Sequence, residues 1–506
     1  MDTKALRQKI LDLAIRGKLV PQNPEDEPAS VLLERIRLEK QQMVKDGKLK
    51  AKDIKNDSVI FVGEDSLHYE KFADGTVKCI EDEIAFEMPE GWALARLKHI
   101  CMMVAGKSKA KEQIKSEPFA GSYPCFGGNG IRGYVDKYNQ DGTFSIVGRQ
   151  GALCGNINIA SGKFYATEHA VVTSLFYGID FNWSNYILEA LQLNKHATGA
   201  AQPGLSVANI LNVFVPVPPT QEQERIGKAI VESIKVIETI EQEKMNLQTI
   251  VTNAKAKILD LAIRGQLVPQ NPDDEPLSAL LERIRTEKEE LIKQGKIKRD
   301  KKESTIFKSE DNSYYEKFAD GTIKCIDEEI PFEIPDTWTW SNLQELCNYG
   351  ECDSIPAEKI PRDAWILDLE DIEKQSGKIL QRLTATERQS TSTKHSFRKN
   401  MVLYSKLRPY LNKVVLADSD GYCTTEILPL DFIDIIYPRY AQFFLMSPFF
   451  VNYAKHCSYG MKMPRLGTKD GKNAYFAIPP YNEQIRIANN IEKIFNTLSN
   501  IENAIK

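Results

Sequence analysis

The chain has 506 residues, with 66 lysines and arginines against 70 aspartates and glutamates, and 42% of its residues are hydrophobic. This length predicts two or three domains, and the hydrophobic fraction excludes wholesale disorder. No apolar stretch is long enough for a transmembrane helix, and the N-terminus lacks the apolar core of a secretory signal. The nine cysteines show no CxxC spacing, so we expect reduced thiols in a cytoplasmic protein. The net charge of −4, taken alone, argues against a nucleic-acid-binding protein.

An internal repeat divides the chain into two halves. Residues 11–24 (LDLAIRGKLVPQNP) recur as 259–272 (LDLAIRGQLVPQNP), and residues 69–92 recur with few changes as 315–338. The halves converge again near their ends, where Leu205 aligns with Leu466. Each half is therefore a repeated frame around a dissimilar centre, which predicts one scaffold with two recognition surfaces. The alternative, tolerant loops, is disfavoured because the centres contain strand-like runs such as FSIVG and MVLYSKL.

Helices are predicted at both ends of the chain and between the halves. In the central and C-terminal helices, apolar residues are spaced alternately by four and three, as in a coiled-coil seam. We expect the central helix to pack antiparallel against the two terminal helices, which together replace it in a circular repeat. The alternative is that each seam packs only on its own domain. The expected seam residues are Ile226, Ile230, Ile237, Leu247 and Val251, followed by Ile487, Ile491, Ile494 and Leu498.

The first centre mixes Gly/Asn turns with short alternating strands, which indicates a half-exposed sheet with long loops. The glycines at 127, 128 and 130 indicate a tight turn rather than a phosphate-binding loop, because no helix pattern follows them. Arg149 lies between two glycines and can reach a phosphate or a base edge. Arg132 and Gln202 are further candidates for DNA contact, Gln202 because it precedes the repeated Pro-x-Leu.

The second centre contains two basic runs without a single acid, at 388–417 and 435–469, with tyrosines among the basic residues. Such runs suit a polyanion, since contacts with phosphates release counterions. The alternative is a solvated surface stripe. We expect the compensating acids in the repeated frame, so that the whole-chain charge hides a basic region. The candidates for DNA contact here are Lys406, Arg408, Lys413, Lys462 and Arg465.

No catalytic constellation is recognisable. Gly106-Lys107-Ser108 resembles the end of a P-loop, but Cys101 stands where the first glycine is required. Ile478-Pro479-Pro480-Tyr481 resembles the loop of adenine methyltransferases, but Ile478 replaces the necessary Asn or Asp, so these prolines are interpreted as helix-entry prolines. The six histidines have no metal-ligand spacing. We therefore expect a non-catalytic protein without a metal.

The chain resembles the specificity subunits of Type I restriction–modification systems over essentially its full length. The resemblance lies in the duplication of several motifs around two dissimilar centres. These motifs are LDLAIRGKLVPQ (11–22) and LDLAIRGQLVPQ (259–270), FEMPEGW (86–92) and FEIPDTW (332–338), PPTQEQERI (218–226) and PPYNEQIRI (479–487), and YSKLRPYLNKVVLA (404–417).

The resemblance implies an α/β (α+β) fold: two mixed α/β target recognition domains separated by long antiparallel coiled-coil helices, in a pseudo-twofold circular repeat. It implies an N-terminal helix (1–20), repeated frames (21–97 and 269–343), recognition domains (98–218 and 344–479), a central helix (219–268) and a C-terminal helix (480–506). Each recognition domain is expected to bind one half of a bipartite, asymmetric site in double-stranded DNA.

The resemblance also implies partners. Two modification subunits would bring S-adenosylmethionine and adenine methylation, and restriction subunits would bring ATP-dependent activity and Mg. No cofactor is expected in this chain itself, and no membrane is expected among its partners. Two alternatives remain at this point: a coiled-coil adaptor that never binds DNA, and a self-sufficient DNA methyltransferase or nuclease with a diverged site.

A central helix of about 45 residues would span about 65–70 Å, so its length is predicted to set the spacing of the half-sites.

Overall fold

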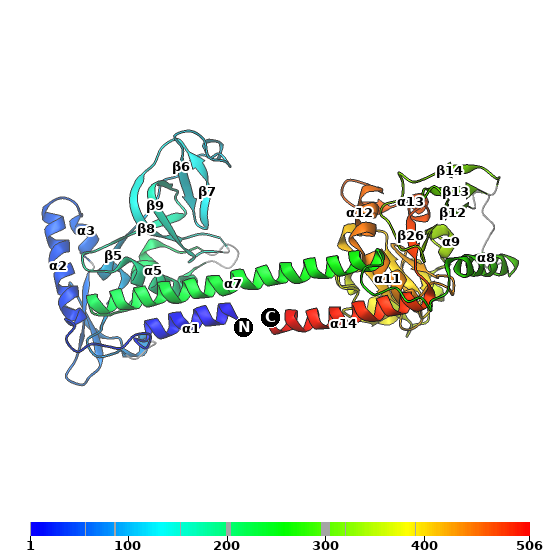
Figure 1. The fold of residues 1–506 in the computed structure, drawn as a ribbon. Helices are drawn as coiled ribbons and strands as arrows, with labels where there is room; N and C mark the ends of the chain where they lie inside the picture. The colour runs from blue at the N-terminus through cyan, green and yellow to red at the C-terminus, as the bar shows by residue number, and fades with distance from the viewer. Residues whose placement is uncertain are drawn as a thin grey trace. The chain divides into compact units, whose positions relative to one another are not determined.

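A computed structural model describes the chain except for residues 1, 56, 85–87, 152, 199–203, 295–303, 319, 390 and 506. The chain divides into two compact units, Met1–Lys244 (unit 1) and Met245–Lys506 (unit 2), each described here by itself (Figure 1). Both units mix helices and strands, which confirms the predicted fold class. Among the helices of the described residues, none combines the length and hydropathy needed to cross a membrane.

The frame of unit 1 begins with helices and a small sheet. Helix α1 (Thr3–Ile15) starts at Asp2, whose side chain accepts a hydrogen bond from the Ala5 amide at 3.0 Å. The helices α2 (Ala29–Lys45) and α3 (Ala51–Ile54) precede an antiparallel sheet of β1 (Ser58–Val62), β2 (His68–Phe72) and β3 (Val77–Cys79). The frame continues with a 3-10 helix η1 (Glu81–Glu83), β4 (Ala93–Arg96) and α4 (Leu97–Ile100).

The centre of unit 1 is a six-stranded sheet in the order β5-β10-β8-β9-β6-β7. Only the β6–β9 pair is parallel. Gly127 lies opposite Gly130 in the hairpin that joins β6 to β7, and Gly130 has a φ of +88°, so the predicted tight turn is confirmed. The strands are β5 (Cys101–Ala105), β6 (Tyr123–Gly127), β7 (Gly130–Val135), β8 (Gln140–Gly148), β9 (Ile157–Ala166) and β10 (Ala170–Leu175), with a 3-10 helix η2 (Lys111–Gln113) before β6.

Unit 1 closes with helices that pack on this sheet and a strand that returns to the frame. These are α5 (Phe181–Ala190), η3 (Leu193–His196), α6 (Val207–Leu211) and β11 (Phe214–Val217). Strand β11 pairs antiparallel with β4 and leads through Pro218 and Pro219 into helix α7 (Thr220–Ile263). The two prolines therefore lie at a helix entry, the role predicted for their counterparts Pro479 and Pro480.

The frame of unit 2 repeats these elements. Helix α8 (Leu277–Lys293) precedes an antiparallel sheet of β12 (Ser304–Lys308), β13 (Tyr314–Phe318) and β14 (Ile323–Cys325). Strand β15 (Thr339–Asn342) pairs with β26 (Tyr475–Ile478), as β4 pairs with β11, and is followed by α9 (Leu343–Leu346). Helix α14 (Tyr481–Ile505) begins just after the second Pro-Pro pair.

The centre of unit 2 has a different sheet arrangement. A five-stranded sheet has the order β16-β19-β22-β17-β18, and a three-stranded sheet has the order β21-β20-β23. The first sheet consists of β16 (Ser354–Ile355), β17 (Trp365–Leu367), β18 (Leu383–Thr384), β19 (Lys394–Phe397) and β22 (Gly421–Thr424); the second consists of β20 (Val402–Ser405), β21 (Val414–Leu416) and β23 (Ile427–Leu430). Helices and a hairpin complete it: η4 (Ala357–Lys359), η5 (Leu369–Asp371), α10 (Ala385–Arg388), η6 (Pro409–Leu411), α11 (Pro438–Met446), α12 (Pro448–His456), β24 (Ser458–Tyr459), β25 (Arg465–Leu466) and α13 (Thr468–Lys472).

Helix α7 has 44 residues, close to the expected length. Its seam is interrupted, because Leu247 is 36% exposed. The buried seam residues Ile226 and Ile230 belong to the core of unit 1. Ile487 and Ile491 belong to the core of unit 2. These four residues therefore pack on their own domain, the alternative that the sequence left open. Ile237 and Val251 are also buried, whereas Ile494 and Leu498 are half-buried.

The long helices of unit 2 run antiparallel to one another, as an ion pair and a hydrogen bond between them indicate. Lys255 Nζ lies 2.8 Å from Glu502, whereas Gln270, beyond the end of α7, donates to Glu483 at 2.7 Å. The residue with the lower number in the first segment, Lys255, thus contacts the one with the higher number in α14, Glu502, as antiparallel helices require. A coiled coil in the strict sense of interlocking side chains stays a prediction.

Candidate nucleic-acid interface

The repeated frame makes the same buried contact in both units. The Trp92 indole donates a 3.0 Å hydrogen bond to Glu222 at the start of α7, and Trp338 donates a 3.0 Å hydrogen bond to Glu483 at the start of α14. Burial raises the pKa of both carboxyl groups, and the indole hydrogen bonds partly oppose this effect. The tryptophan of each frame motif is thereby tied to the helix that follows the centre.

A second repeated contact involves the acidic turn after the first conserved motif. Arg225 pairs with Asp26 at 2.5 Å, and Arg486 pairs with Asp274 at 2.6 Å. The aspartates are nearly buried, and each arginine binds both carboxylate oxygens. These acids therefore connect distant parts of the frame.

In unit 2 a short hairpin lies against the basic motif of the centre. Strands β24 and β25 pair through Ser458 with Leu466 and through Tyr459 with Arg465. The Leu466 amide donates to the Lys406 carbonyl at 3.0 Å, and the Arg408 amide donates to the Pro464 carbonyl at 2.7 Å. Two segments far apart in sequence thus form one small surface.

Unit 1 builds the same arrangement from unrelated residues. Thr198 and Gly204 exchange two backbone hydrogen bonds of 2.8 Å, and the Leu205 amide donates to the Arg149 carbonyl at 2.8 Å. Since Leu205 is the counterpart of Leu466 in the repeat, Arg149 occupies the position of Lys406. The two centres thus place a basic residue at the same point relative to the leucine of the repeated Pro-x-Leu, although their sequences differ.

Four of the five candidates in the second centre lie together at this hairpin. Arg408 and Lys462 are exposed, and the Arg408 guanidinium lies 3.5 Å from the Lys462 carbonyl. Lys406 is half-buried. Arg465 binds both oxygens of Glu426, with Nε–Oε2 and Nη2–Oε1 distances of 3.0 and 2.9 Å, and the hydrogen bond to this carboxylate raises the pKa of Arg465. Its charge is therefore compensated, and its side chain is oriented.

The remaining candidates lie elsewhere or outside the described residues. Lys413 donates to the Leu369 carbonyl, and burial, together with the nearby charge of Lys374, lowers the pKa of Lys413. Its ammonium group is thus held by η5 rather than by the hairpin. Arg132 is exposed on β7. Gln202 lies in 199–203, outside the described residues.

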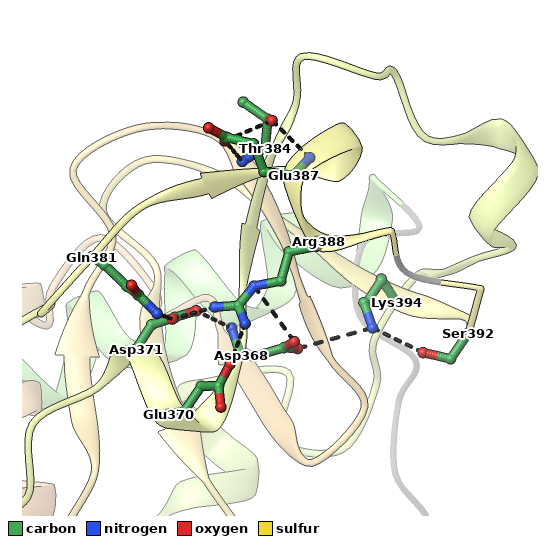
Figure 2. A network of polar contacts seen from close by, with 9 residues as sticks. All are labelled: Asp368, Glu370, Asp371, Gln381, Thr384, Glu387, Arg388, Ser392 and Lys394. Carbon is green, nitrogen blue, oxygen red and sulfur yellow. Dashed lines mark hydrogen bonds and ion pairs between the residues drawn. The ribbon is translucent and has the colours of Figure 1, made fainter.

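The expectation that the compensating acids lie in the repeated frame is wrong for part of the basic run. The Arg388 guanidinium lies between Glu370 and Asp371 (Figure 2). Its Nε atom is 3.7 Å from Asp368. Lys394 donates to Ser392 at 2.8 Å and lies 3.9 Å from Asp368. Both basic side chains are nearly buried. Acids of the same centre thus compensate the charges of basic residues that lie in a stretch of sequence without acids.

The tip of the β24–β25 hairpin contains exposed residues that charge patterns do not reveal. The Met461 side chain is fully exposed, at 104%, and Tyr459 is 63% exposed. The only sequence signal for this tip is the pair of turn-forming residues around it, Gly460 and Pro464.

The chemistry of a metal centre is absent from the described residues, which contain no group of three or more His, Cys, Asp or Glu side chains able to hold a metal ion. All nine cysteines are free thiols.

Comparison with known proteins shows which proteins this chain is similar to. Residues 89–249 match the family described as the Type I restriction modification DNA specificity domain. The chain is related to the specificity subunits of Type I restriction enzymes, which confirms the resemblance found in the sequence.

Two specificity subunits of Escherichia coli are among the relatives of this chain. It is 25% identical to the Type I restriction enzyme EcoAI specificity subunit, over 99% of this chain and 90% of that protein. It is 44% identical to the EcoprrI specificity subunit of the same organism, over 29% of this chain and 36% of that protein. A solved structure from work on complex assembly and conformational transition of the type I R-M system has 13% identity and a TM-score of 0.49, covering 83% of this chain and 94% of that one.

Proposed function

We propose that this chain is the DNA-reading subunit of a Type I restriction–modification complex. Unit 1 would bind one half of a bipartite target in double-stranded DNA, and unit 2 would bind the other half. The proposed recognition domains are residues 98–218 and 344–479, with the repeated frame and the helices 219–268 and 480–506 as scaffold. The chain itself would perform no catalysis.

The observation that supports this proposal best is the shared position of Arg149 and Lys406. The backbone carbonyl of each accepts a hydrogen bond from the leucine of the repeated Pro-x-Leu, Leu205 for Arg149 and Leu466 for Lys406. Basic residues at equivalent points of two dissimilar centres suit two dissimilar DNA half-sites, because Arg and Lys bind phosphates and guanine edges. An asymmetric target follows from the dissimilarity of the centres.

The scaffold would position the catalytic partners. We propose that two modification subunits hold S-adenosylmethionine and methylate adenine, and that restriction subunits hold ATP and Mg. The repeated frame, with its paired contacts at Trp92 and Trp338, gives two similar partners two similar docking regions. A complex that acts on chromosomal DNA would work in the cytoplasm.

The test is a map of methylated adenines in host genomes that carry single variants. Arg149→Ala should relax or abolish recognition of one half-site only, and Lys406→Ala should do so for the other. Lys399→Ala, which removes an exposed charge of the same basic run, is the control for Lys406 and should leave the recognised bases unchanged. Methylation that stays identical in both alanine variants would contradict the assignment.

Two outcomes would favour the alternatives. Methyl transfer or DNA cleavage by the purified chain alone would identify a self-sufficient enzyme. A complex with its partners that fails to bind any duplex at any salt concentration would identify an adaptor, since contacts with phosphates strengthen as salt is lowered.

A further inference from the structure

The tip of the β24–β25 hairpin has a feature that contacts between basic residues and DNA bases do not explain. Met461 at this tip is fully exposed although its side chain is apolar. Met side chains are usually part of a core or of an apolar interface. We propose that Met461 enters between two neighbouring base pairs as a wedge and opens that step in the half-site bound by unit 2. This inference rests on the proposed function.

The hairpin fixes the wedge in place by its own turn. Gly460 has a φ of +99°, which disfavours any side chain there, and a Cβ atom at this position would lie 3.2 Å from the Met463 carbonyl oxygen. The turn is therefore tight, and Met461 follows it directly, in the five-residue loop between the paired residues Tyr459 and Arg465.

The base of the hairpin is anchored on both sides. Arg465 donates three hydrogen bonds to Glu426 and also donates to the Met463 carbonyl at 3.3 Å. On the other side, the backbones of Lys406 and Arg408 bind Leu466 and Pro464. A side chain can separate two base pairs only if the backbone that carries it does not yield. These hydrogen bonds hold the base of the hairpin in place.

The charges around the tip favour DNA over an apolar protein surface. Lys462 follows the wedge directly, and the Arg408 guanidinium lies against the Lys462 carbonyl, so two exposed cations flank the apolar residue. The acid next to them, Glu426, is compensated by Arg465. Apolar wedges that open base steps in DNA are found beside cations that bind phosphates, because the bent duplex then offers more contacts.

The other unit has no such residue at the corresponding position. In the repeat, Met461 aligns with Ala200, and the whole segment 199–203 (GAAQP) lacks methionine and aromatic residues. The structure of this segment lies outside the described residues. From the sequence alone, the opened step is confined to one of the two half-sites.

The experiment uses the full chain assembled with its modification subunits and duplexes that carry 2-aminopurine at one position at a time, never at the methylated adenine. The wild-type complex should raise the fluorescence severalfold at one step in the half-site of unit 2 and at no step in the other. Met461→Ala should abolish this rise, Met461→Leu should keep it, and Met463→Ala serves as the matched control because Met463 is also exposed on the same hairpin.

A second readout avoids fluorescence. A mismatch at the opened step should tighten binding of the wild-type complex by about tenfold, because the unstacking is then largely done in advance, and Met461→Ala should lose this gain. No rise at any unmethylated position, or an unchanged rise in Met461→Ala, overturns the wedge. Impaired assembly of Met461→Ala with the modification subunits in the absence of DNA overturns it too, in favour of a protein contact. A wild-type complex that binds no DNA contradicts the proposed function instead.

Discussion

The two centres reach the same local arrangement through different sheets. Unit 1 has a single six-stranded sheet, whereas unit 2 divides its strands between a five-stranded and a three-stranded sheet. Yet Arg149 and Lys406 both accept a backbone hydrogen bond from the leucine of the repeated Pro-x-Leu. The frame therefore decides where the basic residue lies, and the centre decides what surrounds it.

The frames also differ, at one buried polar cluster beside the small sheet. In unit 1, Glu70 pairs with Arg96 at 2.6 Å and accepts from Ser58 at 2.5 Å. In unit 2, the corresponding Glu316 accepts from Ser304 at 2.5 Å and from Asn342 at 3.3 Å. The same sheet is thus held by an ion pair in one unit and by a neutral amide in the other.

The largest expected effect concerns the helix that belongs to both units. Inserting or deleting about one turn near Lys244 should change the spacer between the half-sites while leaving both half-sites unaltered, because each unit keeps its own centre. Methylation at the original target should disappear and reappear at targets with a different spacer. Mapping methylated adenines measures this, and an unchanged spacer would contradict the idea that α7 sets the distance.

The next effect tests the hairpin surface of the second centre. Arg408→Ala should lower methylation at the cognate site by about 10–100-fold, as expected for loss of a specific Arg–DNA contact. Lys399→Ala should have a much smaller effect. Initial methylation rates of the assembled complex on a cognate duplex give the comparison. If Arg408→Ala methylates like the wild type, Arg408 is not a DNA contact.

A smaller effect tests whether the two frames are equally tight. Gly17 (φ +63°) and Gly265 (φ +69°) lie against Pro89 and Pro335, and a Cβ atom would lie 2.5 and 2.4 Å from their Cγ atoms. Alanine at either position should cost about 2–4 kcal/mol of unfolding free energy, from overpacking and backbone strain.

Gly75 and Gly321 provide the matched control for this pair. Both have a φ of +87°, but no atom lies within 4 Å of the position that a Cβ atom would take, so alanine there should cost only about 1 kcal/mol. Denaturant unfolding of the full chain measures all four variants. Equal costs at Gly17 and Gly75 would show that the tight packing against Pro89 contributes nothing.

The smallest effect uses pH to distinguish the frames. His99 in unit 1 is replaced by Glu345 in unit 2. Burial lowers the pKa of His99 to about 3, and the positive charge of Lys98 acts in the same direction. Its Nδ1 atom accepts from the Arg96 amide at 3.1 Å, so its other nitrogen carries the proton and faces Ser58 at 3.2 Å.

The sign of the pH effect follows from the lowered pKa of His99. The unfolded chain binds a proton below about pH 6.5 whereas the folded chain does not, so the stabilisation is complete above that pH and is lost as the pH falls toward 3. Hydrogen exchange of β1, corrected for intrinsic rates, should lose protection between pH 7 and pH 5. His99→Gln should flatten this dependence, and β12 of unit 2 is the internal control. Equal pH profiles in wild type and variant would contradict the burial of a neutral His99.

Much of the fold was predictable because it depends on local patterns. The repeated motifs located both frames, and the Pro-Pro pairs located the starts of α7 and α14. Heptad spacing predicted the length of α7 but not the exposure of Leu247, since periodicity indicates which residues share a face and not what covers that face.

The candidate site was only partly predictable. Residue type, with the glycines and prolines nearby, made Arg149, Lys406, Arg408 and Lys462 candidates, and their contact with DNA stays a prediction. Met461 was not, because nothing in its composition or spacing sets it apart from a core methionine.

The sequence by itself determined the duplicated frame, the helix entries and the identity of the basic residues in the second centre. Only the tertiary structure decided which of those residues keep their charge available. Arg388 meets Asp371 and Arg465 meets Glu426, in each case across many residues of chain. The physical reason is that electrostatic compensation depends on the distance between charges in space, which the order of residues along the chain does not contain.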